Sequence, residues 1–97
     1  MQKRYPFSVH KHAHDIEFRR NRVKNTIDAC HMGEIFYTSE NLQKLYVLEE
    51  KLTDLLLAVM SGNGIVCYLT GEQIALAKES VLWANETRAE TQRKKGR

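Results

Sequence analysis

Residues 18–24 have the types and spacing to bind a polyanion, because they read Phe-Arg-Arg-Asn-Arg-Val-Lys. Lysine and arginine contacts to phosphates release counterions and supply most of the sequence-independent affinity for nucleic acid. The planar guanidinium of arginine binds phosphate through two hydrogen bonds, and an aromatic ring among the cations can stack on a base. We therefore expect nucleic-acid contacts from Phe18, Arg19, Arg20, Arg22 and Lys24. The alternative is a solvated helix face, with Phe18 packed under the N-terminal segment.

Charge is unevenly distributed along the 97 residues, whose formal net charge is +3. Residues 1–24 carry +5, residues 25–86 carry −6 and residues 87–97 carry +4. The basic ends either contact a polyanion, pair with the acidic middle of the same or a neighbouring subunit, or are simply solvated. In the first case, the footprint on the nucleic acid also includes Lys3, Arg4, Lys11 and the basic tail at residues 93–97.

Three histidines, His10, His12 and His14, alternate with other residues near the N-terminus. Residues two positions apart point in different directions on a helix, whereas in an extended segment they share a face. A zinc site would also need Cys30 or His31 as a ligand. We interpret the histidines as solvent-facing side chains at the start of a helix, and we predict neither a metal site nor a cofactor.

The two cysteines do not indicate catalysis. Cys30 is followed by His31, but adjacent helical residues do not face one another. Cys67 lies in an apolar run, where a thiol is usually buried and unreactive. No glycine-rich phosphate loop accompanies them. We expect no enzyme activity, and the spacing of 37 positions gives no disulfide framework and no zinc-ligand pattern.

The composition, with 42% hydrophobic and 28% charged residues, is that of one globular domain covering residues 1–97. No apolar run approaches the ~18 residues of a membrane span. The first ten residues are charged and have no apolar stretch after them, so no secretory signal is expected. Together with the unpaired cysteines, these features predict a cytoplasmic protein.

Three helices must position the candidate residues. Gly33 is a typical stop for the first helix. Thr38 or Ser39 is expected to cap the second, and Thr70 with Gln73 forms a capping box for the third. The predicted spans are approximately residues 12–31, 39–61 and 71–90.

The remaining segments are short. Residues 1–11 are predicted as an extended basic arm or, because Tyr5 and Phe7 alternate with other residues, as a short edge strand. Residues 65–69 are β-branched and aromatic, which favours a short strand or a buried crossing segment. Residues 91–97 are predicted as a flexible basic tail.

Apolar periodicity predicts how the helices pack. The second helix carries a heptad seam, and the third carries a stripe of small residues that suits close antiparallel packing. We predict an all-α, three-helix domain with a long antiparallel hairpin of the last two helices and an extended N-terminal arm. The seam consists of Leu45, Leu48, Leu52, Leu55 and Val59, and the small stripe of Ile74, Ala77, Val81 and Ala84.

A second apolar surface exceeds what a three-helix core requires, which favours a homodimer or a protein partner. Its members are Tyr46, Leu57, Leu76 and Trp83. We therefore expect a small non-catalytic regulatory protein that binds DNA, RNA or a nucleoprotein complex through its basic first helix and termini. The alternative is a phage- or plasmid-type adaptor or inhibitor that binds a protein through the apolar surface of the third helix.

Overall fold

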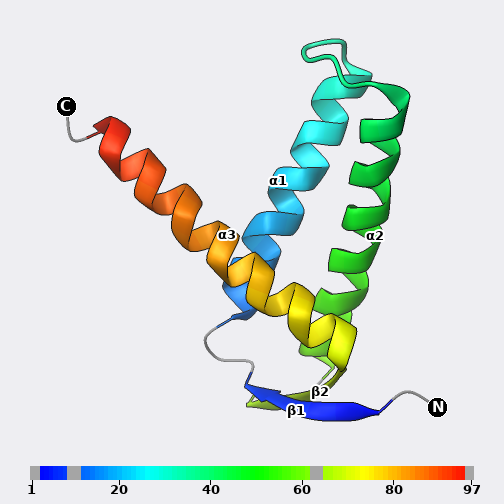
Figure 1. Cartoon of the computed structure of the whole chain (residues 1–97), viewed down its shortest axis with the longest axis vertical. Coiled ribbons are helices and arrows are strands. Elements are labelled where there is room, and N and C mark those ends of the chain that lie inside the picture. The colour runs from blue at the N-terminus through cyan, green and yellow to red at the C-terminus, as the bar shows by residue number, and fades with distance from the viewer. Residues whose placement is uncertain (1–2, 9–11, 62–64, 96–97) are drawn as a thin grey trace.

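The computed structural model describes residues 3–8, 12–61 and 65–95. Its elements follow the order β1 (Arg4–Ser8), α1 (Ala13–His31), α2 (Ser39–Met60), β2 (Val66–Thr70) and α3 (Gly71–Lys95) (Figure 1). The predicted helical character is confirmed in its broad form, because three helices make up most of the chain and a small two-stranded sheet lies beside them. In the part of the chain that the structure describes, no helix is both long enough and apolar enough to cross a membrane.

The predicted helix starts and the first helix stop are confirmed. Thr38 Oγ1 accepts a hydrogen bond from the backbone N–H of Asn41 at 3.2 Å, which satisfies a free donor in the first turn of α2. Thr70 Oγ1 accepts from the Gln73 N–H at 3.2 Å, and Gln73 Oε1 accepts from the Thr70 N–H at 3.0 Å. Gly33 adopts a φ of +75° just after α1, a conformation that glycine reaches without strain.

α3 is longer than predicted. The helix continues to Lys95, so residues 91–95 of the predicted flexible tail are helical. Alanine, glutamine, arginine and lysine all favour helices, and cations in the last turn interact well with the negative end of the helix dipole. Local propensity therefore carries α3 past the position where its tertiary contacts end.

The N-terminal arm contains a strand. β1 pairs antiparallel with β2, with Pro6 opposite Tyr68 and Phe7 opposite Cys67. Cys67 is buried in the core, and Phe7 packs against it from the partner strand. The edge-strand alternative is therefore the one that the structure supports for residues 4–8, while residues 1–2 and 9–11 of the arm lie outside the described residues.

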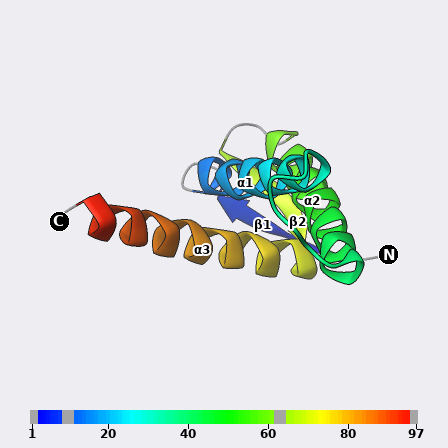
Figure 2. The ribbon, with the colours of Figure 1, turned by 90° about the horizontal axis from the view of Figure 1, so that it is seen from above.

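The helix hairpin is formed by α1 and α2, and not by the last two helices as predicted. α1 and α2 lie side by side and are joined by a short loop, whereas α3 crosses them (Figures 1 and 2). The reason is the seam of α2, whose Leu52 packs with Val23 and Ile27 of α1. β2 then redirects the chain, so that α3 crosses the hairpin near the end that holds the sheet (Figure 1).

The core divides into two clusters along the hairpin. The first joins α1, α2, β2 and α3 through Ile16, Leu55, Val59, Cys67, Leu69 and Ala77. The second consists of Val23, Ile27 and Leu52, all from α1 and α2. The far half of α3 points away from the hairpin (Figure 1), and the side chains of residues 88–93 are all exposed. The second cluster is therefore built mainly by two helices.

Candidate nucleic-acid interface

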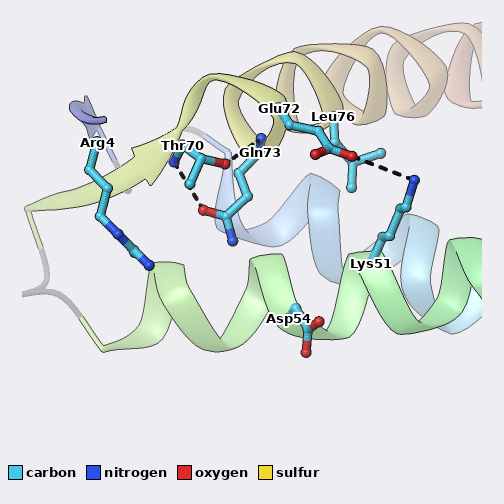
Figure 3. A pocket seen from close by; sticks show the side chains of 7 residues that line it. All are labelled: Arg4, Lys51, Asp54, Thr70, Glu72, Gln73 and Leu76. Atoms are coloured by element: carbon cyan, nitrogen blue, oxygen red, sulfur yellow. Dashed lines mark hydrogen bonds and ion pairs between the residues drawn. The ribbon is translucent and has the colours of Figure 1, made fainter. Parts of the chain in front are cut away.

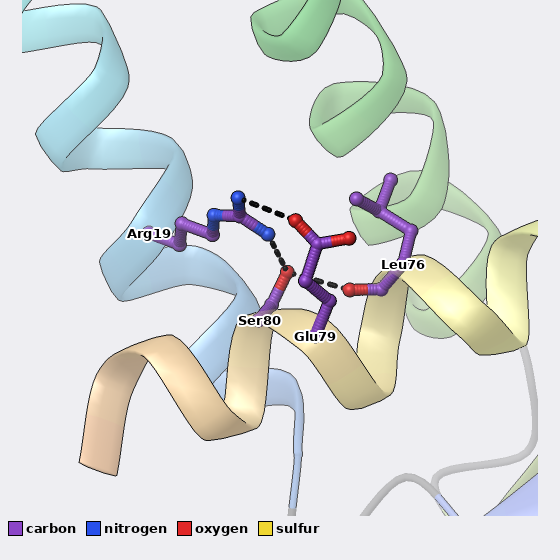
Figure 4. A network of polar contacts seen from close by, with 4 residues as sticks. All are labelled: Arg19, Leu76, Glu79 and Ser80. Atoms are coloured by element: carbon purple, nitrogen blue, oxygen red, sulfur yellow. Dashed lines mark hydrogen bonds and ion pairs between the residues drawn. The ribbon is translucent and has the colours of Figure 1, made fainter. Parts of the chain in front are cut away.

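Arg19 of the basic run lies inside the fold. Its Nη1 donates to Ser80 Oγ at 3.1 Å and its Nη2 to Glu79 Oε1 at 3.0 Å (Figure 4). Ser80 Oγ in turn donates to the Leu76 carbonyl at 2.7 Å. The Arg19 side chain is 11% exposed. The guanidinium predicted to contact phosphate instead joins α1 to α3.

The other cations of the run point in different directions, because each helical residue advances by about 100° around the axis. Arg20 is half-buried and its Nε donates to Thr53 Oγ1 of α2 at 3.0 Å. Arg22 and Lys24 are exposed. The basic run therefore does not form a single surface, since two of its four cations hold α1 against the other helices.

Phe18 lies at the junction of α1 and α3. Its ring centroid is 5.2 Å from that of Trp83, with the rings tilted by 52°. Arg22 and Arg88 approach the same ring, with guanidinium carbons 5.9 Å and 5.4 Å from its centroid. Phe18 is thus packed, as the alternative expected, but its aromatic partner among the described residues is Trp83 of α3.

Arg88 connects the Phe18 junction to the N-terminal end of α1. It forms an ion pair with Asp15, whose carboxylate is largely buried. An open cleft of about 310 Å³ lies beside this pair and is lined by His14, Glu17, Phe18, Asn21 and Arg88. Arg88 was not among the predicted nucleic-acid contacts, although its position in the basic C-terminal segment could have indicated it as one.

The N-terminal cations lie far from α3's basic end. Lys3 and Arg4 are exposed, and Arg4 Nη1 donates to the Tyr68 carbonyl at 3.4 Å. Arg4 faces a cavity of about 300 Å³ in which carboxylates accompany the cations (Figure 3). β1 and the far end of α3 lie on different sides of the molecule (Figure 1). Lys11 lies outside the described residues.

The predicted apolar partner surface is largely used inside the fold. Leu76 packs against both core clusters, and Trp83 packs against Phe18. Tyr46 is half-buried beside the second cluster and its hydroxyl is hydrogen-bonded to His31 Nε2. Leu57 is 61% exposed. The structure therefore brings Tyr46 and Leu76 to the same cluster and leaves Leu57 on the surface.

An apolar surface that the sequence analysis missed lies in the loop between α1 and α2, here termed the hairpin tip (residues 32–37). Phe36 is 88% exposed and Met32 is 73% exposed, and Ile35 and Tyr37 are also exposed. The available signal was the run Ile-Phe-Tyr directly after the helix-stopping glycine and Glu34. Large apolar side chains grouped on a surface are typical of binding sites.

The described histidines and cysteines either pack against neighbouring residues or are exposed, and they do not form a site together. The His12 ring lies 5.3 Å from the Phe7 ring between centroids, His14 is exposed, and His10 lies outside the described residues. Among the described residues, no group of three or more His, Cys, Asp or Glu side chains could hold a metal ion. Cys67 is buried, and its Sγ donates to the Phe7 carbonyl at 3.7 Å.

Burial raises the pKa of the Cys67 thiol above its ordinary value of 9.0. The unfolded chain therefore ionises this thiol at a lower pH than the folded chain does, so its contribution to stability is complete below about pH 9 and is lost as the pH rises further. We expect the free energy of unfolding, measured by urea titration, to fall less steeply above about pH 9 in Cys67→Ala than in the wild type. Cys30→Ala, which removes the more exposed thiol, should keep the wild-type slope. Equal slopes in the wild type and Cys67→Ala would contradict this assignment.

Comparisons of the chain with protein-family models, curated protein sequences and solved structures found no match.

Proposed function

We propose that the protein is a small non-catalytic regulator that binds nucleic acid, or a nucleoprotein complex, chiefly through the far end of α3. The observation that carries this proposal is the departure of α3 from the body, which leaves every side chain of residues 88–93 exposed. Four of the residues from 88 to 95 are basic and one is acidic. Arg88 is paired with Asp15 of α1, but beyond this residue the projecting basic helix offers cations to phosphates without first breaking tertiary contacts.

α1 supports this surface through Arg22. The Arg22 guanidinium lies near Phe18, and Arg88 of α3 approaches the same ring. Arg22 and the end of α3 would therefore contact one nucleic acid from adjacent helices. Lys3 and Lys24 are exposed elsewhere and would add long-range attraction. Arg19 and Arg20 would act indirectly, because they fix α1 against α3 and α2.

The triple variant Arg93→Ala/Lys94→Ala/Lys95→Ala is expected to weaken binding to a generic duplex or RNA at low salt by about tenfold or more. If each cation neutralises one phosphate, the slope of log affinity against log salt should become shallower by about 2 to 3. Fluorescence anisotropy of labelled duplex and labelled RNA at several salt concentrations measures both quantities.

The matched control is Lys44→Ala/Lys51→Ala. These lysines lie on α2 and form ion pairs with Glu40 and Glu72 at 3.7 Å and 3.5 Å, so they are exposed cations outside the proposed surface. This variant should bind nearly as the wild type does. Absence of binding at low salt, or equal binding by the triple variant and the wild type, would overturn the proposal.

Protein binding is the second proposed function, as a cytoplasmic adaptor or inhibitor. The observation that favours it is the exposure of Met32 and Phe36 at the hairpin tip. Leu76 and Trp83 of α3, which face other side chains, contribute less to such a surface. The two proposals differ in their salt dependence, since an apolar contact is steered by charge but does not depend on it.

A further inference from the structure

We propose that the protein forms a two-fold dimer in which the hairpin tip of each copy inserts between the hairpin and α3 of the other copy. The occupant is a second copy of this chain, and the docking site is a groove beside the second core cluster. This inference goes beyond the proposed function and does not require it.

The groove is lined by side chains from all three helices and from the loop. Its apolar lining consists of Val23, Tyr37, Leu45, Leu48 and Trp83, and its polar lining of Arg19, Arg22 and Thr26. It encloses about 210 Å³, which is below the ~300 Å³ at which small-molecule pockets begin. The groove is therefore suited to one large side chain and not to a cofactor.

The groove is open because α3 diverges from the hairpin. α3 covers the first cluster, but its far half points away from α1 and α2 (Figures 1 and 2). Leu45 and Leu48 beside the second cluster consequently remain only half-buried. A further element packed at this position would complete the second cluster as α3 completes the first.

The hairpin tip has the apolar character that this position requires. Phe36 is 88% exposed, while its neighbour Tyr37 lines the groove of the same copy. The Phe36 ring is therefore not packed in the groove of its own copy, and it remains available to an equivalent groove in a second molecule.

Charge complementarity supports the same pairing. Residues 28–40 around the tip contain Asp28, Glu34 and Glu40 and no lysine or arginine. The end of α3 is basic, and it lies apart from the tip within one copy (Figure 1). Insertion places the acidic tip of one copy beside the basic end of α3 of the other. Because both contacts occur twice about a two-fold axis, the assembly closes as a dimer.

Sedimentation velocity tests this arrangement on the full chain. We expect a dimer in the wild type between about 1 and about 100 µM, and a dissociation constant at least about tenfold weaker in Phe36→Ser, since aromatic anchors dominate interfaces. The substitution leaves the charge unchanged and alters an exposed side chain, so the circular dichroism spectrum should be that of the wild type. Leu57→Ser is the matched control, because Leu57 is an exposed apolar residue outside the tip. A wild type that is monomeric throughout this range, or a Phe36→Ser variant that dimerises as the wild type does, would overturn the proposal. Dimer loss in Leu57→Ser equal to that in Phe36→Ser would overturn it as well.

A photo-crosslinking residue at position 36 locates the contact without removing the aromatic anchor. Adducts are expected on the second chain at Val23, Leu45, Leu48 or Trp83. Adducts confined to another face, or capture of a different protein by a chain that remains monomeric, would overturn the placement. Phe36→Ser removes no cation and leaves the proposed nucleic-acid surface of each copy intact, so loss of the dimer with retained nucleic-acid binding distinguishes the two proposals.

Discussion

Replacing Leu55 with alanine is expected to lower the free energy of unfolding by about 2–5 kcal/mol. Leu55 is completely buried in the first cluster, where α1, α2, β2 and α3 meet. The substitution removes apolar contacts within this cluster and leaves a cavity that close packing cannot easily fill. Since domains of this size have a total stability of about 5–15 kcal/mol, the unfolded fraction should rise sharply. Urea titration measures the loss, with the fluorescence of Trp83, the single tryptophan, as the signal.

Leu57→Ala is the matched control for this prediction. It lies on the same helix two positions away, but it is 61% exposed. Substitution of an exposed leucine should change the free energy of unfolding by less than about 0.5 kcal/mol. Equal losses in the two variants would mean that Leu55 is not in the core.

Ala77→Leu is expected to destabilise the protein by about 1–3 kcal/mol, although leucine favours helices nearly as well as alanine does. Ala77 is completely buried in the first cluster, on the stripe by which α3 crosses the hairpin. The larger side chain must push α3 away from Ile16 and Leu55 or adopt a strained rotamer. The same urea titration measures the loss.

The control for this prediction is Ala75→Leu, because Ala75 is exposed on the other side of α3. It should leave the free energy of unfolding within about 0.5 kcal/mol of the wild type. A stable Ala77→Leu variant would show that α3 does not cross the hairpin closely at this position.

The helices were predictable because their boundaries depend on residues close in sequence. Thr38 reaches an amide three residues away, and Thr70 and Gln73 satisfy each other across one turn. Gly33 likewise ends α1 through its own backbone conformation. The extension of α3 to Lys95 was missed because the change in composition near residue 90 marks the end of tertiary contacts and not the end of the helix.

The packing of the helices was not predictable from periodicity. The stripe of small residues on α3 allows any helix to pack closely against it. It does not determine whether that helix runs alongside α3 or crosses it. The direction of α3 depends on β2, which pairs with a strand at the other end of the sequence. A contact between Phe7 and Cys67 has no local signal, so the sequence cannot show that the N-terminal arm joins the core.

For the candidate site too, one part was predictable from the sequence and another depends on contacts between distant residues. The sequence shows which residues are cationic, but their partners in the fold decide which of them remain available to a ligand. Arg19 is paired with Glu79, and Arg20 with Thr53, both far away along the chain. Helical spacing offers one signal, because Ile16, Val23 and Ile27 form an apolar stripe on the first helix and Arg20 interrupts it. The buried Arg19 lies at the border of the same stripe, three residues after Ile16, whereas the exposed Arg22 lies off it.

Pro6 has a consequence for how the protein behaves at high concentration. Proline has no amide hydrogen, so β1 has one backbone donor fewer at its centre, where Pro6 lies opposite Tyr68. Proline is found almost only on edge strands, at the first residue of a strand or at bulges, because it cannot donate to a ladder. Natural sheets use proline in this way to resist edge-to-edge aggregation. Pro6 is thus a feature that disfavours the addition of a further strand to the small sheet when the protein is concentrated.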